Sequence, residues 1–102
     1  MFVFGLFELS MIQSFGNEDT KELFTKEKNR RFSGIARVAC RKLFQLNRAI
    51  LLSDLAVPPG NSLEALKGKG AGWHSIRIND QWRIVFRWTD AGPDKVAIID
   101  YH

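Results

Sequence analysis

The chain has 102 residues, 15 lysines and arginines against 11 acidic residues, a formal net charge of +4, and 45% apolar residues. A chain of this length can bury roughly two-thirds of its unfolded surface, so one hydrophobic core is feasible and intrinsic disorder is excluded. The single cysteine, Cys40, has no partner for an intrachain disulfide. This excludes a disulfide framework and indicates a reducing compartment, so we expect a cytoplasmic protein.

Residues 1–10 differ in character from the rest, because they are mostly apolar and contain no cation. They are too short to span a bilayer, and they lack the basic region and the small-residue cleavage site of a signal peptide. No membrane association is therefore predicted. We expect residues 1–10 to be an N-terminal extension that is dispensable for function, and residues 11–102 to form one domain.

Two helices are predicted in the first half of that domain, after a short strand over Ile12–Phe15. Asn17 can cap a helix over Glu18–Lys26, whose first turn carries acids that suit the positive end of the helix dipole. Ser33 can cap the second helix. Apolar residues recur there at steps of three and four, which predicts an amphipathic helix; they are Ile35, Val38, Ala39, Leu43, Leu46 and Ile50.

A meander of strands is predicted in the second half. Two prolines and a Gly-Asn pair break regular structure between Val57 and Ser62, and from Trp73 the apolar period changes to two. This predicts three strands, over His74–Ile78, Trp82–Trp88 and Lys95–Tyr101. The order of elements indicates an α+β fold in which two N-terminal helices pack on one face of an antiparallel sheet.

The register between the first two of these strands determines which side chains lie on the sheet face that the helices do not cover. A three-residue loop, Asn79-Asp80-Gln81, pairs Ile76 with Ile84, whereas a two-residue loop would place Ile76 opposite an arginine. We therefore predict the three-residue loop. It places the tryptophans of the second strand on the core face and puts three arginines together on the opposite face: Arg77, Arg83 and Arg87.

The cations are clustered, which is typical of a surface that binds a polyanion. Seven lysines and arginines and no acid lie between Lys28 and Ser53. Those at steps of four and seven form a stripe on the second helix: Arg37, Arg41 and Arg48. A second group joins the sheet arginines to loop residues Lys67 and Lys69. From charge alone, a solvated basic surface is an equal alternative, and Arg87 in particular can be explained as sheet solvation.

The chain ends in Asp100-Tyr101-His102, which adds groups able to transfer protons beside the arginines. Arginine matches the geometry of a phosphate, and an ordinary histidine has a pKa of about 6.5. These groups suffice to cut RNA without a metal or cofactor, provided that His102 is ordered. His74 shares the parity of Ile76 and is interpreted as structural. The histidines, Cys40 and Asp100 lack the spacing of a zinc site, so no metal is expected.

Several stretches in this order closely resemble the HigB-like, or killer-protein, branch of the RelE/ParE toxin superfamily. They are Leu66-Lys67-Gly68, Ser75-Ile76-Arg77-Ile78-Asn79, Trp82-Arg83-Ile84-Val85-Phe86 and the final Asp100-Tyr101-His102. The resemblance covers residues 11–102 and implies the RelE/ParE fold. It also implies a toxin of a type II toxin–antitoxin system that cleaves mRNA on the ribosome. The implied partners are a HigA-like helix-turn-helix antitoxin, the ribosome with its mRNA, and operator DNA only through the antitoxin.

The resemblance also implies roles for individual residues. Arg83 matches the family's phosphate-stabilising arginine, the last three residues match its C-terminal catalytic group, and Lys67 matches a loop lysine near the RNA. The chain departs from the pattern at Glu64, where some members carry a catalytic histidine. Two alternatives remain at this point: a ParE-like toxin that poisons DNA gyrase without chemistry of its own, and a basic module that only binds nucleic acid.

Overall fold

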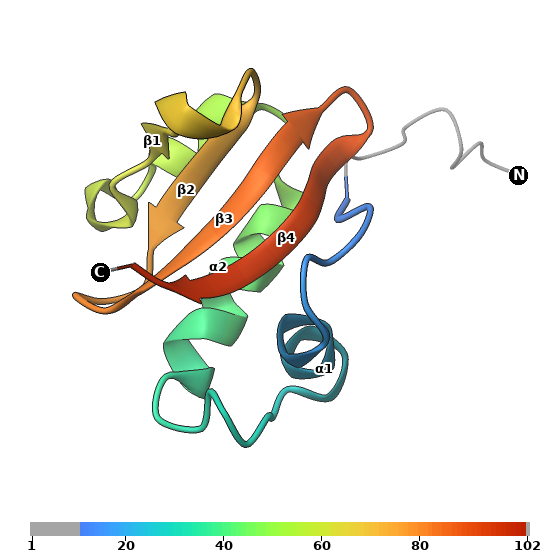
Figure 1. Cartoon of the computed structure of the whole chain (residues 1–102), viewed down its shortest axis with the longest axis vertical. Helices are drawn as coiled ribbons and strands as arrows, with labels where there is room; N and C mark the ends of the chain where they lie inside the picture. The colour runs from blue at the N-terminus through green and yellow to red at the C-terminus, as the bar shows by residue number, and fades with distance from the viewer. Residues whose placement is uncertain (1–10, 102) are drawn as a thin grey trace, which may run out of the picture.

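The computed structural model describes residues 11–101, so the predicted extension over residues 1–10 and the candidate catalytic His102 lie outside the described part. Within it, two helices pack on one face of a four-stranded antiparallel sheet of order β1-β2-β3-β4 (Figure 1), which confirms the predicted α+β class. The elements are α1 (Glu18–Lys26), α2 (Ala36–Arg48), β1 (Glu64–Ala65), β2 (Trp73–Arg77), β3 (Trp82–Thr89) and β4 (Gly92–Asp100), with short 3-10 helices at Leu52–Ala56, Pro59–Asn61 and Lys67–Lys69.

Helix α1 has the bounds that its capping residue predicted. Asn17 is extended, and its Oδ1 accepts a hydrogen bond of 2.8 Å from the Thr20 amide. The Thr20 hydroxyl accepts a hydrogen bond of 2.9 Å from the Ile98 amide of β4. The first turn of α1 therefore covers the outer edge of β4 and holds the helix against the sheet.

Helix α2 begins later than predicted, and the prediction that Ser33 caps it is wrong. The N-cap residue of α2 is Ile35, whose side chain makes no capping hydrogen bond. Residues 31–35 instead form a turn, which brings the fully buried Phe32 ring edge-on to Trp82, 5.4 Å between centroids. Burial of that ring fixes the backbone before the helix starts. The helix ends at Arg48, so Ile50 leaves the predicted stripe and is 59% exposed.

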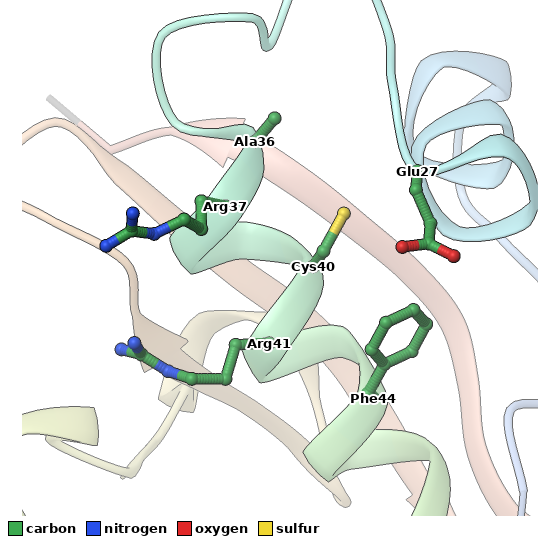
Figure 2. Close-up of a pocket in the computed structure, with 6 residues that line it drawn as sticks. All are labelled: Glu27, Ala36, Arg37, Cys40, Arg41 and Phe44. Atoms are coloured by element: carbon green, nitrogen blue, oxygen red, sulfur yellow. The ribbon is translucent and has the colours of Figure 1, made fainter.

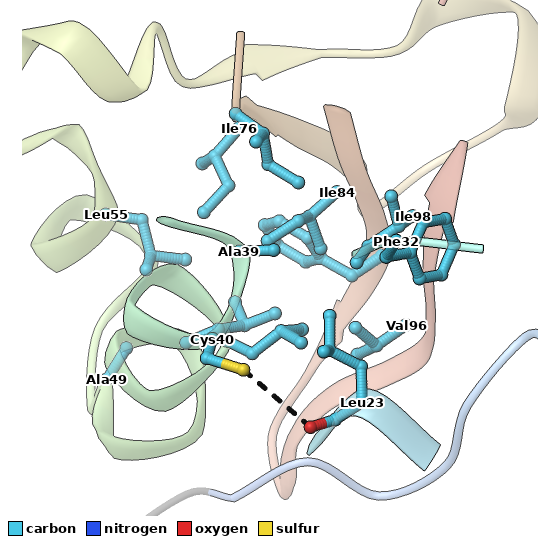
Figure 3. Close-up of a cluster of buried hydrophobic side chains, with 14 residues drawn as sticks. Leu23, Phe32, Ala39, Cys40, Ala49, Leu55, Ile76, Ile84, Val96 and Ile98 are labelled. Carbon is cyan, nitrogen blue, oxygen red and sulfur yellow. Dashed lines mark hydrogen bonds between the residues drawn. The ribbon is translucent and has the colours of Figure 1, made fainter. Parts of the chain in front are cut away.

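The apolar stripe of α2 faces the core side of the sheet (Figure 3). Ala39, Leu43 and Leu46 are buried, and the Cys40 thiol, buried beside them, donates a 3.7 Å hydrogen bond to the Leu23 carbonyl of α1. Burial, followed by the charge of Glu27, raises the pKa of this thiol. Cys40 is therefore a packing residue that joins the two helices. From the sheet, the core receives Ile76, Ile84, Phe86, Val96 and Ile98.

The predicted register of β2 and β3 is confirmed. Ile76 pairs with Ile84, and the Ile78 amide donates to the Trp82 carbonyl at 2.9 Å across the three-residue loop. Asn79 shapes this loop by accepting the Trp82 amide at 2.8 Å. Trp82 and Trp88 pack against the core, as expected from their parity.

The sheet has one strand more than predicted, and its last strand starts earlier. β4 begins at Gly92 and contains an irregularity opposite the step from Val85 to Arg87, with Lys95 at a φ of 52°. The two-residue strand β1 was not predicted; it pairs Glu64 with Ser75. The predicted strand over Ile12–Phe15 is reduced to a bridge between Phe15 and Val96. No helix in the described residues is long and apolar enough to cross a membrane.

Candidate RNA-cleaving site

The face of the sheet that the helices leave uncovered carries the three predicted arginines. Arg77 pairs directly with Arg83 across β2 and β3, and Trp73 pairs with Arg87 four residues further along β3. Alternation along each strand therefore places these side chains on one face, together with Ser75. The prediction that the sheet arginines share a face is confirmed, and it is the face opposite the two helices.

Arg83 is the most firmly held of these arginines. Its Nε donates to the Ser75 hydroxyl at 2.8 Å, and its Nη2 donates to the Ser62 carbonyl at 2.6 Å and to the Ser75 carbonyl at 3.3 Å. The side chain is only 9% exposed. Among the described residues, no hydrogen bond involves its Nη1. Arg83 is thus a rigid, permanently charged group with one donor edge unused by the described part of the chain.

Glu64 and Tyr101 complete the group around Arg83. Glu64 Oε1 lies 3.9 Å from Arg83 Nη2 and accepts a 3.3 Å hydrogen bond from the Tyr101 hydroxyl. The Arg83 guanidinium lies 5.2 Å from the centre of the Tyr101 ring. Glu64 Oε1 therefore links the Tyr101 side chain to Arg83 of β3. The pairing of β1 with β2 is what places Glu64 beside Arg83.

The other two sheet arginines also have acidic partners. Arg77 forms an ion pair with Asp80 of the β2–β3 loop. Arg87 Nη2 donates to Asp94 Oδ2 at 3.1 Å, and the Ser14 hydroxyl donates to Asp94 Oδ1 at 2.6 Å. The Ser14 bond is the main reason that the pKa of Asp94 is lowered. Each of the three arginines on this face is therefore partly neutralised within the chain.

The two loop lysines reach the same end of the sheet as Trp73. Lys67 and Lys69 lie in the exposed 3-10 helix that precedes β2. Lys69 Nζ is 5.0 Å from the centre of the Trp73 ring. Gly70 and Gly72 have positive φ values of 103° and 85°, which a side chain would oppose. They let the loop turn back onto the strand.

The C-terminal residues are only partly brought into the group. Asp100 pairs with Trp82 across β4 and β3, and its Oδ2 accepts a 3.0 Å hydrogen bond from Gln81 Nε2. The Tyr101 amide donates to the Gln81 carbonyl at 2.7 Å. These bonds extend the sheet to Tyr101 and hold it beside Arg83. The structure describes no position for His102.

The basic stripe of α2 is separate from this site. Arg37, Arg41 and Arg48 are exposed on a helix that covers the opposite face of the sheet. Arg37 and Arg41 extend from one side of α2, next to a pocket in which Cys40 and Phe44 face α1 (Figure 2). The two groups of cations that the sequence predicted therefore occupy different surfaces.

Lys42, which was not among the predicted site residues, connects these surfaces. It is buried, and its Nζ donates to the Arg77 carbonyl at the end of β2. Burial lowers its pKa, and the charges of Arg41, Arg77 and Arg83 lower it further. Its position among the apolar residues of α2 was a signal that the side chain turns inward.

The described residues contain no group of three histidine, cysteine or acidic side chains that could hold a metal ion. His74 is placed as expected for a structural residue. Its Nδ1 lies 3.0 Å from the Gly72 carbonyl, and its ring stacks on Phe86 at 6.3 Å between centroids. Of the described residues, those next to Arg83 that can transfer a proton are therefore Glu64 and Tyr101, while the other sheet arginines and the loop lysines supply positive charge.

Comparison with known proteins agrees with this arrangement. The family model described as "RelE-like toxin of type II toxin-antitoxin system HigB" matches residues 13–102. Toxin HigB-1 of Vibrio cholerae is 39% identical over 82 residues, which are 78% of this chain and 86% of that protein. An uncharacterized protein of Haemophilus influenzae is 36% identical over 56 residues, 55% of each chain. HigB toxins are endonucleases that cleave mRNA during translation, and a type II toxin has a protein antitoxin as its partner. The chain belongs to the HigB-like family of RelE-like toxins of type II toxin–antitoxin systems.

Proposed function

We propose that this toxin cleaves mRNA on the ribosome without a metal ion, with the scissile phosphate bound against Arg83. The observation that carries the proposal is the group formed by Arg83, Glu64 and Tyr101, in which a nearly buried guanidinium lies under an exposed phenol and beside a carboxylate. Ser75 and Ser62 fix the guanidinium, so little reorganisation is needed when charge develops on the phosphate. The Nη1 edge of Arg83 is the donor edge offered to a phosphate oxygen.

The proposed reaction is attack by the RNA 2′-hydroxyl oxygen on the adjacent phosphorus. The new P–O2′ bond forms as the P–O5′ bond breaks, giving a cyclic phosphate and a free 5′-hydroxyl. Glu64 accepts the proton from the 2′-hydroxyl, and Arg83 stabilises the crowded anionic phosphorus. His102, or Tyr101 in its place, supplies the proton to the leaving 5′-oxygen. Proton transfer and arginine charge are sufficient for every step, so no metal is required.

Glu64 has opposite effects on binding and on chemistry in this proposal. Its negative charge opposes entry of the phosphate, while its basicity serves the first proton transfer. The ribosome offsets the first effect by holding the message in position, so that weak intrinsic binding is tolerated. Asp100 orients Tyr101 through the end of β4. Lys67, Lys69, Arg77 and Arg87 contact flanking phosphates on the same face.

The helical stripe of Arg37, Arg41 and Arg48 has a different proposed role, because it lies on the other surface. We assign it to docking on ribosomal RNA. The proposed antitoxin is a HigA-like helix-turn-helix protein, and the toxin reaches operator DNA only through that partner. An adjacent reading frame encoding such a protein would be the expected genetic context.

The test is to map message ends after brief expression of the toxin in cells. Wild-type toxin should leave cuts in phase with codons, whereas a gyrase poison or a passive nucleic-acid binder would leave none. Arg83→Ala and deletion of residues 101–102 should relieve growth inhibition. Unchanged growth inhibition and unchanged cleavage in both variants would overturn the assignment.

A second set of variants separates chemistry from folding, since Glu64 and Tyr101 are 48% and 41% exposed and contribute little to the core. Glu64→Gln should bind RNA more tightly but cut it more slowly, and Tyr101→Phe should lose the bond to Glu64. Glu64→His should restore cleavage above that of Glu64→Gln. Asp90→Asn removes one carboxylate from the exposed β3–β4 turn and serves as the matched control, with cleavage expected to equal wild type.

A further inference from the structure

Trp73 differs from the other two tryptophans of the chain. Trp82 and Trp88 belong to β3 and pack against the hydrophobic core. Trp73 begins β2 and pairs with Arg87, which places it on the uncovered face with the sheet arginines. A large, half-buried aromatic on a basic surface is not explained by core packing. Its placement on the face that carries Arg83 is the first observation that points to RNA.

The surroundings of Trp73 repeat those of Tyr101 at the other end of the same face. At one end, the Arg83 guanidinium lies 5.2 Å from the Tyr101 ring centre, and at the other, Lys69 Nζ lies 5.0 Å from the Trp73 ring centre. Aromatic side chains along a cationic track are the arrangement by which proteins hold single-stranded nucleic acid, since bases stack on the rings and cations contact the backbone.

The spacing between the two ends fits a short oligonucleotide. Arg83 pairs with Arg77 and Arg87 pairs with Trp73, so the two positions are four residues apart along β3. At about 3.3 Å per residue this is about 13 Å. A stacked strand rises about 3.4 Å per nucleotide, so about four nucleotides span the distance when stacked, and fewer when splayed apart.

We propose that Trp73, flanked by Lys69 and Arg87, is a base-stacking subsite that holds an unpaired mRNA base two to four nucleotides from the phosphate at Arg83. The inference rests on the proposed function and extends it, because it assigns a position on the message beyond the cleaved bond. Gly70 and Gly72 shape the loop so that Lys69 turns onto the ring. Trp73 is a binding residue here and takes no part in proton transfer.

The decisive experiment is a binding measurement on the full-length toxin. A 2′-O-methyl RNA tetranucleotide is the probe, because it cannot be cleaved by its own 2′-oxygen. The three tryptophan indole N–H signals are followed by ¹⁵N NMR, and Trp73→Phe and Trp88→Phe assign them. The Trp73 signal should shift with saturation while that of Trp88 stays within the line width. A titration that shifts the Tyr101 ring signals but leaves the Trp73 indole unchanged would overturn the proposal.

Affinity provides the second readout. Trp73→Leu should bind the tetranucleotide about 10-fold more weakly, whereas Trp73→Phe, which keeps an aromatic face, should stay within about 3-fold of wild type. Binding of Trp73→Leu at wild-type affinity would overturn the subsite. If Trp73→Leu fails to fold by circular dichroism, the wild-type NMR titration decides alone. Because the probe is uncleavable, loss of stacking and loss of the proposed nuclease activity are observed in separate experiments.

Discussion

Replacing Arg83 should destabilise the fold as well as stop cleavage, and the structure gives the size of the effect. Arg83→Met removes two hydrogen bonds shorter than 3 Å, to the Ser75 hydroxyl and the Ser62 carbonyl. Hydrogen bonds to a charged group contribute about 1.5–3 kcal/mol each, and Ser75 is fully buried, so water cannot replace the lost donor. Burial of the methionine side chain returns about 1.5–3 kcal/mol. The two bonds together contribute about 3–6 kcal/mol, so we expect a net loss of about 1.5–3 kcal/mol.

The measurement is urea unfolding followed by tryptophan fluorescence, with the melting temperature as a second readout. In a domain of this size the expected loss corresponds to a fall of about 6–24 °C in Tm. Arg87→Met is the matched control, because its side chain is 43% exposed and its ion pair with Asp94 should contribute less than about 1 kcal/mol. The reasoning would be refuted if the unfolding free energy of Arg83→Met lay within about 0.5 kcal/mol of wild type. It would also be refuted if Arg87→Met lost as much unfolding free energy as Arg83→Met. Either result would show that the network seen around Arg83 does not hold the guanidinium in place.

Two further predictions concern elements far from Arg83. Ser14→Ala removes the main cause of the lowered pKa of Asp94. An acid with a lowered folded-state pKa stabilises the fold above its unfolded value, about 3.9, and this contribution is lost as pH falls through the folded value. The difference in unfolding free energy between wild type and Ser14→Ala should therefore be present at pH 7 and shrink below about pH 4; a constant difference from pH 7 to pH 3 would contradict it. Asn17→Ala should cost about 1 kcal/mol in the same assay by removing the cap of α1, and Asn17→Ser only a few tenths, whereas equal losses would argue against the cap.

Local rules predicted the parts of the fold that depend on neighbouring residues. Asn17 fixed the start of α1, and the alternation in β2 and β3 fixed the three-residue loop and so the face that Arg83 occupies. The prediction that Ser33 caps α2 was wrong because burial of Phe32 against Trp82 sets the start of that helix. This contact joins residues 50 positions apart in the sequence. Such contacts leave no periodic signal in the sequence.

The candidate site shows the same limit. The positions of the sheet arginines followed from parity, but their acidic partners did not. The ion pair of Arg83 with Glu64 depends on the two-residue strand β1, which is too short to give a pattern. Trp73 was predictable in principle, since two-residue alternation from Arg77 passes through Ser75 to it. Starting the predicted strand over His74–Ile78 one residue earlier would have placed Trp73 on the face that carries the arginines.

The acidic partners of the sheet arginines have a consequence for how the toxin responds to salt. A carboxylate beside each arginine lowers the net positive charge that this face presents to a phosphate, so binding releases fewer of the cations condensed on the RNA. Binding of single-stranded RNA normally weakens with a log–log slope of about −0.7 per phosphate contact. The slope for this face should therefore be shallower than its three arginines would suggest. A toxin built in this way competes poorly for free RNA in dilute salt and loses little further affinity at high ionic strength.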